Sequence, residues 1–222
     1  MIQNTLVLLK PDAYLRRYIG ACVLREFRSE RTFKIKAFKE VTASRSLAEK
    51  HYDVHREKPF FKKLVDYLTL GPVIAMVVEG ENVIPSIRLM LGSTFSEKAE
   101  PHTIRGKYGI WNGINVVHAS DGDNTAKYEI KLWREEAGVE EMDFSRVNLL
   151  IDNYIEKWSK LRIDNTLKLR EICRLISIGE SRFEDCEQKI FKLLREECID
   201  SDESIVKKFV KIIADNLQDQ KK

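Results

Sequence analysis

The hydrophobic pattern in the first part of the chain predicts alternating strands and helices. Val73–Glu79 is a strongly apolar run, and in Phe33–Thr42 apolar positions alternate with basic ones. Alternation with period two is typical of a half-buried strand, whereas apolar spacings of three and four are typical of an amphipathic helix. The predicted strands are Thr5–Lys10, Phe33–Thr42, Val73–Glu79 and Ile114–Val117, the last of them ending in His118. The predicted helices are Arg17–Arg28, Arg45–Tyr52, Phe60–Leu70, Val83–Leu91 and Thr125–Trp133.

The order of these elements approximates βαββαβ with additional helices. Such an order favours an α+β domain in which an antiparallel sheet carries its helices on one face.

The last third of the chain carries apolar positions at helical spacing. Val147, Ile151, Tyr154, Trp158 and Leu161 step by four and three residues in turn. The predicted helices of this region are 147–161, 167–178, 181–198 and 204–217, and a serine and a glutamate three residues apart, Ser181 and Glu184, form a capping-box pattern at the start of the third. Each helix has one apolar stripe, so we expect the four to pack on one another.

Proline and glycine divide the chain at the same place. All five prolines lie between Pro11 and Pro101, and nine of the ten glycines lie at or before Gly138. Because these residues are kept out of helix interiors, the chain is predicted to consist of a mixed domain, 1–138, and an all-α C-terminal region of unknown function, 139–222.

Composition narrows the class of protein. The net charge is only +3, so binding to nucleic acid is not indicated. No apolar run approaches the roughly 20 residues that span a bilayer, and the N-terminus lacks a secretory pattern, so no membrane contact is expected. Four scattered cysteines with no metal-type spacing favour a cytoplasmic, intracellular protein.

His118 is the strongest candidate for chemistry. It follows the apolar pair Val116-Val117 and precedes a turn of small residues. Imidazole is a nucleophile near pH 7 when a partner on its other nitrogen fixes the tautomer, and Ser120 and Glu129 are near enough in sequence to supply one. A lone histidine of this kind is more often structural, so His118 needs support from other groups.

Cationic and aromatic residues supply that support. Lys10, Arg88 and Arg105 are positive groups of the kind that phosphoryl transfer requires, although each could equally be ordinary surface charge; Arg105 is expected in a turn. The segment Arg56–Lys63 places two phenylalanines among basic residues, one ring suited to stack a nucleobase and the other to pack in the core. Glycine-rich phosphate loops are absent from the sequence, and any metal is expected to be Mg²⁺ carried on phosphates.

Several separated motifs, in register over residues 2–135, resemble the nucleoside diphosphate kinase family. They are Leu8-Leu-Lys-Pro-Asp12, His51-Tyr-Asp-Val-His-Arg-Glu-Lys-Pro-Phe-Phe61, Gly71-Pro-Val-Ile-Ala-Met-Val77, Arg88-Leu-Met-Leu-Gly92, Pro101-His-Thr-Ile-Arg-Gly106, Asn115-Val-Val-His-Ala-Ser-Asp121 and Trp133.

The resemblance implies a ferredoxin-like βαββαβ fold and a ping-pong transfer of the γ-phosphoryl group from a nucleoside triphosphate to a nucleoside diphosphate through phospho-His118. It also implies the roles of the site residues. Lys10 and Asn115 would hold the ribose and phosphate end of the nucleotide, and the phosphates would be bound by Arg88, Thr94 and Arg105. The base would be contacted by Phe60, Leu64 and Asn112. Glu129 and Ser120 would orient His118, with Tyr52 nearby, and Asp121 would reach Mg²⁺ through water.

The sequence departs from the family pattern at a few positions. Ala119 stands where the family has glycine after the histidine, and a requirement for positive φ there would cost alanine about 1 kcal/mol. Asn112 stands where the family usually has an apolar residue, Ile114 replaces a frequent arginine, and the usual Asn-Pro after Thr94 is absent.

Three functions compete. An active kinase is favoured because the catalytic set is intact. A catalytically weak nucleotide-binding scaffold with a helical interaction module is the alternative, and a nucleic-acid binder that uses Lys34–Lys39 and Arg56–Lys63 is third. Relatives of this kind are commonly hexamers or tetramers, so a homo-oligomer is expected, and residues 139–222 could instead bind a protein partner.

Overall fold

The four predicted strands form one antiparallel sheet in the computed structural model, which describes residues 1–218. The strands are β1 (Ile2–Leu9), β2 (Phe33–Val41), β3 (Val73–Glu81) and β4 (Val117–Ala119), in the spatial order β2-β3-β1-β4. Every neighbouring pair is antiparallel. The α+β class and the ferredoxin-like strand order are therefore confirmed.

The position of the last strand was predicted wrongly. The sequence indicated a strand over Ile114–Val117 that ends in His118, but β4 begins at Val117 and has His118 as its middle residue. Val116 has a φ of +63°, a left-handed conformation that strands do not use, so the β-ladder starts only after it.

Helices connect and cover the strands. In the mixed domain they are α1 (Pro11–Leu15), α2 (Arg17–Ser29), α3 (Arg45–His51), α4 (Phe61–Leu68), α5 (Val83–Leu91), α6 (Ile104–Tyr108) and α7 (Asp123–Ala137), with short 3-10 turns η1 (Asp53–His55) and η2 (Ser96–Lys98). The predicted turn at Arg105 is helix α6 instead, because the Thr103 hydroxyl accepts the Gly106 N–H at 3.2 Å and caps a helical turn.

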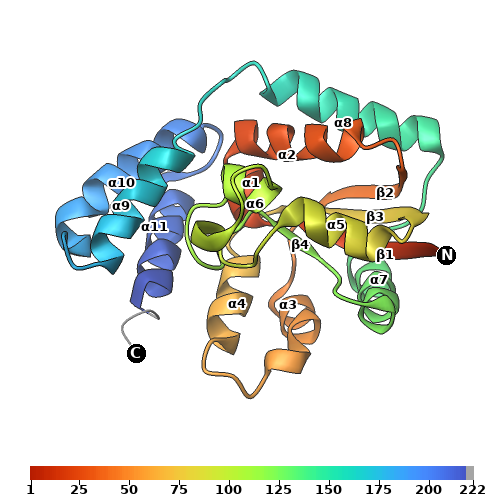
Figure 1. Ribbon diagram of the computed structural model, residues 1–222, viewed down its shortest axis with the longest axis horizontal. Helices are drawn as coiled ribbons and strands as arrows, with labels where there is room; N and C mark the ends of the chain where they lie inside the picture. Colours follow the sequence, from red (N-terminus) through yellow and green to blue (C-terminus); the bar gives the residue numbers. More distant parts are fainter. Residues whose placement is uncertain (219–222) are drawn as a thin grey trace.

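Helices lie on both faces of the sheet, contrary to the prediction of one covered face. In β1 the side chains of Val7 and Leu9 join a core with α2 and α5, whereas Leu6 and Leu8 join a second core with α3, α4 and α7. Figure 1 shows α2 above the sheet and α3, α4 and α7 below it. The central strands are apolar at consecutive positions, as expected for strands that are buried on two sides.

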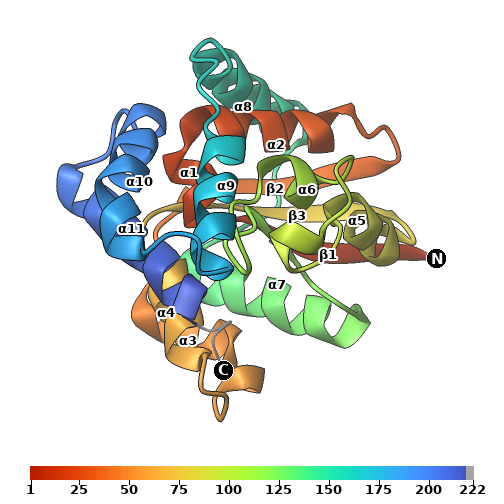
Figure 2. The same ribbon diagram turned by 60° about the vertical axis from the view of Figure 1, so that its left-hand side comes forward.

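The C-terminal region forms four helices but not one bundle. They are α8 (Phe144–Trp158), α9 (Thr166–Ser177), α10 (Phe183–Glu197) and α11 (Glu203–Gln218). Helices α9, α10 and α11 pack together as expected, whereas α8 lies along α2 and β2 (Figures 1 and 2). Its apolar stripe of Val147, Ile151 and Tyr154 is buried in the core on the upper face of the sheet.

The predicted capping box at Ser181 is absent. Helix α10 starts two residues later, with Arg182 as its N-cap and without a side-chain cap hydrogen bond. The Arg182 guanidinium instead pairs with the Asp185 carboxylate in the first turn, at 2.9 Å.

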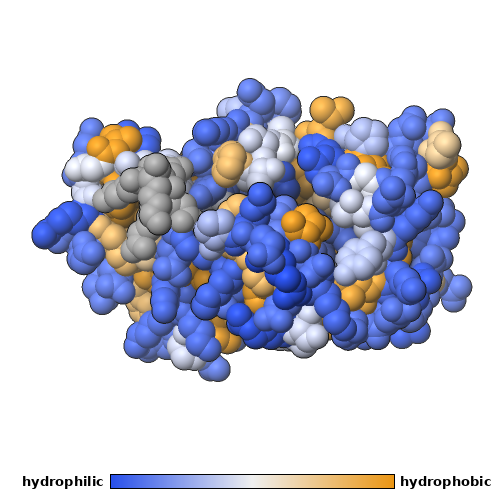
Figure 3. Space-filling view, turned by 90° about the horizontal axis from the view of Figure 1, so that it is seen from below, coloured by the Kyte–Doolittle hydropathy of each residue, from blue (hydrophilic) through white to orange (hydrophobic). Residues whose placement is uncertain are grey.

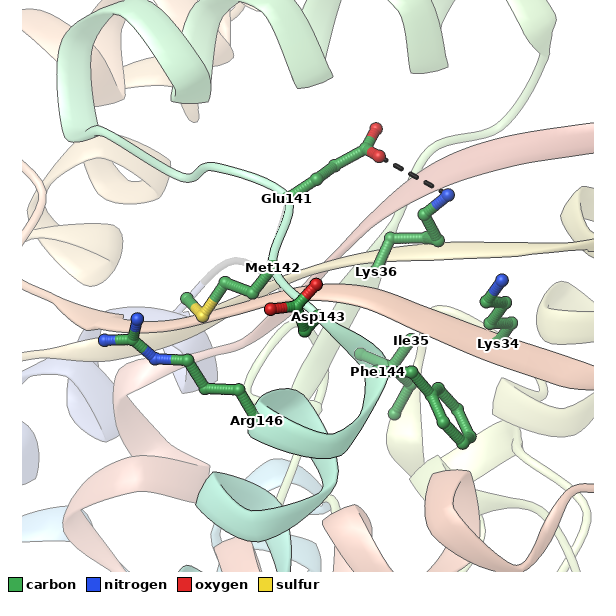
Figure 4. A pocket seen from close by; sticks show the side chains of 8 residues that line it. All are labelled: Lys34, Ile35, Lys36, Glu141, Met142, Asp143, Phe144 and Arg146. Atoms are coloured by element: carbon green, nitrogen blue, oxygen red, sulfur yellow. Dashed lines mark ion pairs between the residues drawn. The ribbon is translucent and has the colours of Figure 1, made fainter.

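The junction between the two regions follows the edge of the sheet. Gly138 ends α7 with a φ of +61°, a conformation that favours glycine. Lys36 is the extra residue of a β-bulge in β2, and its carbonyl accepts the Met142 N–H at 2.9 Å. The Lys36 ammonium also pairs with Glu141 at 3.4 Å beside a cavity of about 520 Å³ (Figure 4). The linker thereby covers part of an otherwise open strand edge.

A buried ion pair fastens the C-terminal helices to the sheet domain. The Arg16 side chain is completely buried and donates to both carboxylate oxygens of Glu197, at 2.8 and 3.1 Å. It also donates to the Tyr108 carbonyl at 3.0 Å and to the Thr166 hydroxyl. Asn165 completes the set by donating its N–H to Glu197 at 2.8 Å.

Seen from below, the face that carries α3, α4 and α7 is mainly hydrophilic, with apolar residues only in small separate patches (Figure 3). Among the helices of residues 1–218, none combines the length and apolar character needed to cross a membrane.

Candidate active site

His118 lies in β4, the strand at one edge of the sheet. It pairs with Leu8 of β1, and its side chain is 22% exposed. Its Nε2 atom lies 3.0 and 3.1 Å from the two carboxylate oxygens of Glu129, which comes from α7. A carboxylate can only accept, so Nε2 carries the proton and Nδ1 keeps its lone pair. Nδ1 makes no hydrogen bond to any residue between 1 and 218 and is therefore available as a nucleophile.

Glu129 is held from its other side. The Ser120 hydroxyl donates to Glu129 at 2.6 Å and accepts the Leu6 N–H at 3.3 Å. Burial opposes ionisation of Glu129, but the adjacent His118 and these hydrogen bonds outweigh it and lower its pKa to about 2. The carboxylate is thus charged at neutral pH, and Ser120 acts on His118 through Glu129.

His51, at the end of α3, forms a neutral wall beside His118. The two rings meet edge to face with centroids 4.7 Å apart. Burial, followed by the nearby His118, lowers the pKa of His51 to about 3, and its Nδ1 accepts the Trp133 indole N–H at 3.3 Å. Tyr52 is buried against His51, at 4.7 Å, where burial raises the pKa of its phenol. Tyr52 therefore lies near the imidazole pair, with no hydrogen bond to His118 within residues 1–218.

Lys10 follows β1 and points toward the same region. Its Nζ donates to the Asn115 side-chain oxygen at 2.8 Å and to the Gly113 carbonyl at 3.4 Å. Burial, with a smaller contribution from Arg105, lowers the pKa of Lys10 to about 7. The amine is therefore poised to gain a full charge when an anion arrives.

A strained turn at Val116 fixes the position of Asn115 relative to His118. Val116 is a β-branched residue with a φ of +63°, an unfavourable conformation. Its N–H donates to the buried Asp12 carboxylate at 3.0 Å, and its carbonyl accepts the Lys10 N–H at 2.8 Å. Ala119 is not among the described residues with positive φ, so the backbone strain considered for that position is absent there. The residue with positive φ near His118 is Val116. Asp12 and Lys10 thus hold the turn that joins Asn115 to His118.

Arg105 and its neighbours lie beside this turn. The Arg105 guanidinium donates to the carbonyls of Gly92 and Val117, each at 3.0 Å, while its buried Nε has no partner within the described chain. Burial and then the positive charge of Arg88 lower the pKa of Arg105 to about 10. The Asn115 amide donates to the Thr94 carbonyl at 2.7 Å, so this loop joins the cluster as well. The positive charges of Lys10, Arg88 and Arg105 thus come from three separate segments and influence one another.

The family can now be assigned. The sequence model described as nucleoside diphosphate kinase matches residues 3–139. The chain belongs to the nucleoside diphosphate kinase family.

Individual relatives agree. A nucleoside diphosphate kinase of Prochlorococcus marinus (strain NATL2A) is 50% identical over 135 residues, which are 61% of this chain and 88% of that protein. Among solved structures, the nucleoside diphosphate kinase of Halobacterium salinarum in complex with CDP is 36% identical with a TM-score of 0.58, covering 64% of this chain and 93% of that one. The enzyme of Encephalitozoon cuniculi gives 34% and 0.57, covering 64% and 95%.

Within the nucleoside diphosphate kinase domain the residues expected at the base are less tightly grouped. The Phe60 side chain is 42% exposed, and its ring centroid lies 5.6 Å from that of His55. Phe61 packs with Leu64 against the second core, which α3, α4 and α7 form with the sheet. Asn112 has a φ of +49° in a tight turn between η2 and β4.

A divalent metal has no oxygen cage among the described residues. The only group of potential ligands there is His51, His118 and Glu129, whose ligand atoms lie within 4.8 Å of one another. Mg²⁺ prefers oxygen ligands, and two imidazoles suit it poorly. Asp121 is exposed, three residues after His118.

The sequence interpretation missed three contributors to the site. It quoted Asp12 and His51 within motifs but gave them no role, and it did not anticipate the strain at Val116. A carboxylate directly after Lys-Pro at a helix start was an available signal for Asp12. No local signal reports the φ of Val116, because a neighbouring carboxylate distant in sequence maintains it.

Proposed function

We propose that this protein is a nucleoside diphosphate kinase that transfers the γ-phosphoryl group between nucleotides through phospho-His118. The observation that carries the proposal is the His118–Glu129 pair, which leaves Nδ1 as a nucleophile in the site that also holds the buried side chains of Lys10 and Arg105. Storing the group on histidine divides one transfer into two half-reactions at a single pocket.

In the first half-reaction the Nδ1 lone pair of His118 forms a bond to the γ-phosphorus. The bond from that phosphorus to the bridging oxygen breaks, and the nucleoside diphosphate leaves with the electron pair. The Glu129 carboxylate stabilises the positive charge that develops on the ring, since it holds the Nε2 proton. A second diphosphate reverses these steps and leaves as a triphosphate.

The surrounding groups bind and orient. Arg88, Thr94 and Arg105 hold the phosphates, and Lys10 with Asn115 holds the ribose and phosphate end. Phe60, Leu64 and Asn112 contact the base, which is bound mainly by stacking, so that different bases are accepted. Mg²⁺ bound to the nucleotide would neutralise part of the phosphate charge, and Asp121 would be the residue that binds it through water.

The retained set of groups argues against a catalytically weak scaffold. Lys10 and Asn115 are hydrogen-bonded to each other, and His118, Glu129 and Ser120 form a continuous chain. A protein that had lost its chemistry would not be expected to keep both arrangements.

Location and assembly are also proposals. The four cysteines are free thiols, which suits a cytoplasmic protein. We propose that the protein forms a homo-oligomer. The alternative is that the exposed faces of the C-terminal helices bind a different protein.

Intact mass spectrometry tests the reaction. Native protein and His118→Ala are exposed briefly to ATP and Mg²⁺, and the native sample is then treated with GDP. The native protein alone should gain one acid-labile phosphoryl group and lose it to GDP as GTP appears. A folded native protein that binds nucleotide and gains no phosphoryl group would establish the scaffold instead.

A further inference from the structure

The last turn of α11 reaches the base end of the proposed nucleotide site. The Asp215 carbonyl accepts the Lys63 ammonium at 2.9 Å, and the Asn216 carbonyl accepts the Asn112 amide at 3.4 Å. Lys63 lies on α4, three residues after Phe60, whereas Asn112 lies in the turn that precedes β4. The last turn of α11 therefore contacts both segments, and Figure 2 shows α11 running down to α4.

The side chain of Asn216 has one oriented acceptor. Its Nδ2 donates to the Ile212 carbonyl at 2.9 Å, so Oδ1 is turned away from the helix. A Cβ placed on Gly113 would lie 3.6 Å from that oxygen. The Gly113 carbonyl in turn accepts Lys10. Only one glycine thus separates the Asn216 oxygen from the lysine at the ribose end.

The last turn of α11 is held firmly. Phe209 and Ile213 are completely buried and Leu217 is 4% exposed, all in the core shared with the sheet domain. An acceptor carried on a packed helix keeps its position without a ligand, which is the condition for selective binding.

We propose that the last turn of α11 forms a third wall of the base site and that Asn216 Oδ1 selects bases that present an amino group. This rests on the proposed function, because it takes Phe60 and Asn112 as base contacts. Cytosine and uracil differ where one carries an amino group and the other a carbonyl. The amino group of cytosine can donate a hydrogen bond to Asn216 Oδ1. The carbonyl oxygen of uracil cannot donate, so it and Oδ1 would both lose hydrogen bonds to water without forming one to each other.

Calorimetric titration of the full-length protein with CDP and with UDP measures the selectivity without turnover. We expect CDP to bind about tenfold more tightly than UDP, as one satisfied against one unsatisfied hydrogen bond predicts. Asn216→Ala should bring the ratio to within about twofold, mainly by weakening CDP. Asn216→Asp, which keeps the acceptor oxygen, should retain the preference.

The matched control is Asn153→Ala, an exposed asparagine on α8 far from α4 in both ribbon views. It should leave the ratio unchanged. Thermal melting verifies the fold of each variant, and Asn216→Ser, which withdraws the oxygen but stays polar, replaces the alanine variant if that one unfolds.

The outcomes separate this inference from the proposed function. Equal affinities in the native protein, or a preference unchanged by Asn216→Ala, would overturn the role of Asn216 even if His118 is phosphorylated. A CDP preference that depends on Asn216 in a protein that never gains a phosphoryl group would overturn the kinase alone. Failure to bind either nucleotide would overturn both.

Discussion

Glu129 decides which nitrogen of His118 is nucleophilic. Replacing its carboxylate by an amide allows an N–H to face Nε2, which moves the ring proton to Nδ1 and removes the charge that stabilises the phosphorylated ring. Glu129→Gln should therefore slow phosphoenzyme formation roughly 10²-fold, by analogy with other histidines oriented by carboxylates. Rapid quenching with labelled ATP measures the rate.

Glu136→Gln on the same helix is the control for that change. Glu136 is an exposed residue paired with Lys50, so its replacement should leave the rate unaltered. A Glu129→Gln enzyme as fast as the native one would show that the tautomer is fixed by another group.

Lys10 should make nucleotide binding depend on pH. Burial lowers the pKa of Lys10 from 10.5 to about 7, so above that pH the free protein holds mostly the neutral amine. A bound phosphate favours the ammonium form and raises that pKa, so binding takes up a proton. Between pH 8 and 9, where nucleotide phosphates are fully ionised, the affinity should fall by up to about tenfold per unit.

Titration in buffers of different ionisation enthalpy counts the protons taken up. The native protein should take up close to one proton per nucleotide at pH 8.5, and Lys10→Gln should take up none through this group. Proton uptake that is the same in both proteins would assign it elsewhere.

At the scale of elements, the periodic pattern predicted long segments well and short ones poorly. The helices at α2, α5, α9 and α11 followed from their apolar stripes, and the buried strands from their apolar runs. Helix α6 and strand β4 are short and depend on the Thr103 cap and on pairing with β1. Such elements are stabilised mostly by tertiary contacts, so their local sequence carries little signal.

The attachment of α9 and α10 to the sheet domain should depend on Glu197. Removing its carboxylate leaves the buried Arg16 guanidinium with the more distant Asp164, at 3.8 Å, as its remaining ion-pair partner. Glu197→Ala should lower the free energy of unfolding by about 3–5 kcal/mol, the usual cost of breaking a buried ion pair. Urea denaturation followed by circular dichroism measures it.

Asp185→Ala gives the comparison for this prediction. Asp185 and its partner Arg182 are exposed, and solvent screens an exposed pair so that its removal should change stability little. Equal losses in the two variants would mean that the Arg16 network adds nothing specific to stability.

At the scale of the whole molecule, the C-terminal region is part of the core of the kinase domain. Helix α8 covers α2, and the Arg170 guanidinium of α9 donates to the Gly106 carbonyl at 2.9 Å at the end of α6. A chain ending at Gly138 would expose the apolar surface beneath α8 and leave Arg16 unpaired. We expect it to aggregate or to change its oligomeric state, because large exposed apolar patches associate.

Light scattering coupled to size exclusion compares that chain with the full-length protein. A truncated chain that stayed soluble and active, with the oligomeric state of the full-length protein, would remove any structural role of residues 139–222.

The sequence by itself determined the first three strands, the long helices and the chemical groups, because local periodicity reports burial and residue types report chemistry. It also carried the family motifs. Tertiary structure decided which residues far apart in the sequence come into contact. Lys10 and Asn115 are 105 residues apart, and Asn112 and Asn216 are 104 apart. No local pattern encodes such contacts, because they depend on how several buried faces share one core. For the same reason only the structure placed helices on both faces of the sheet and brought the end of α11 to the proposed base site.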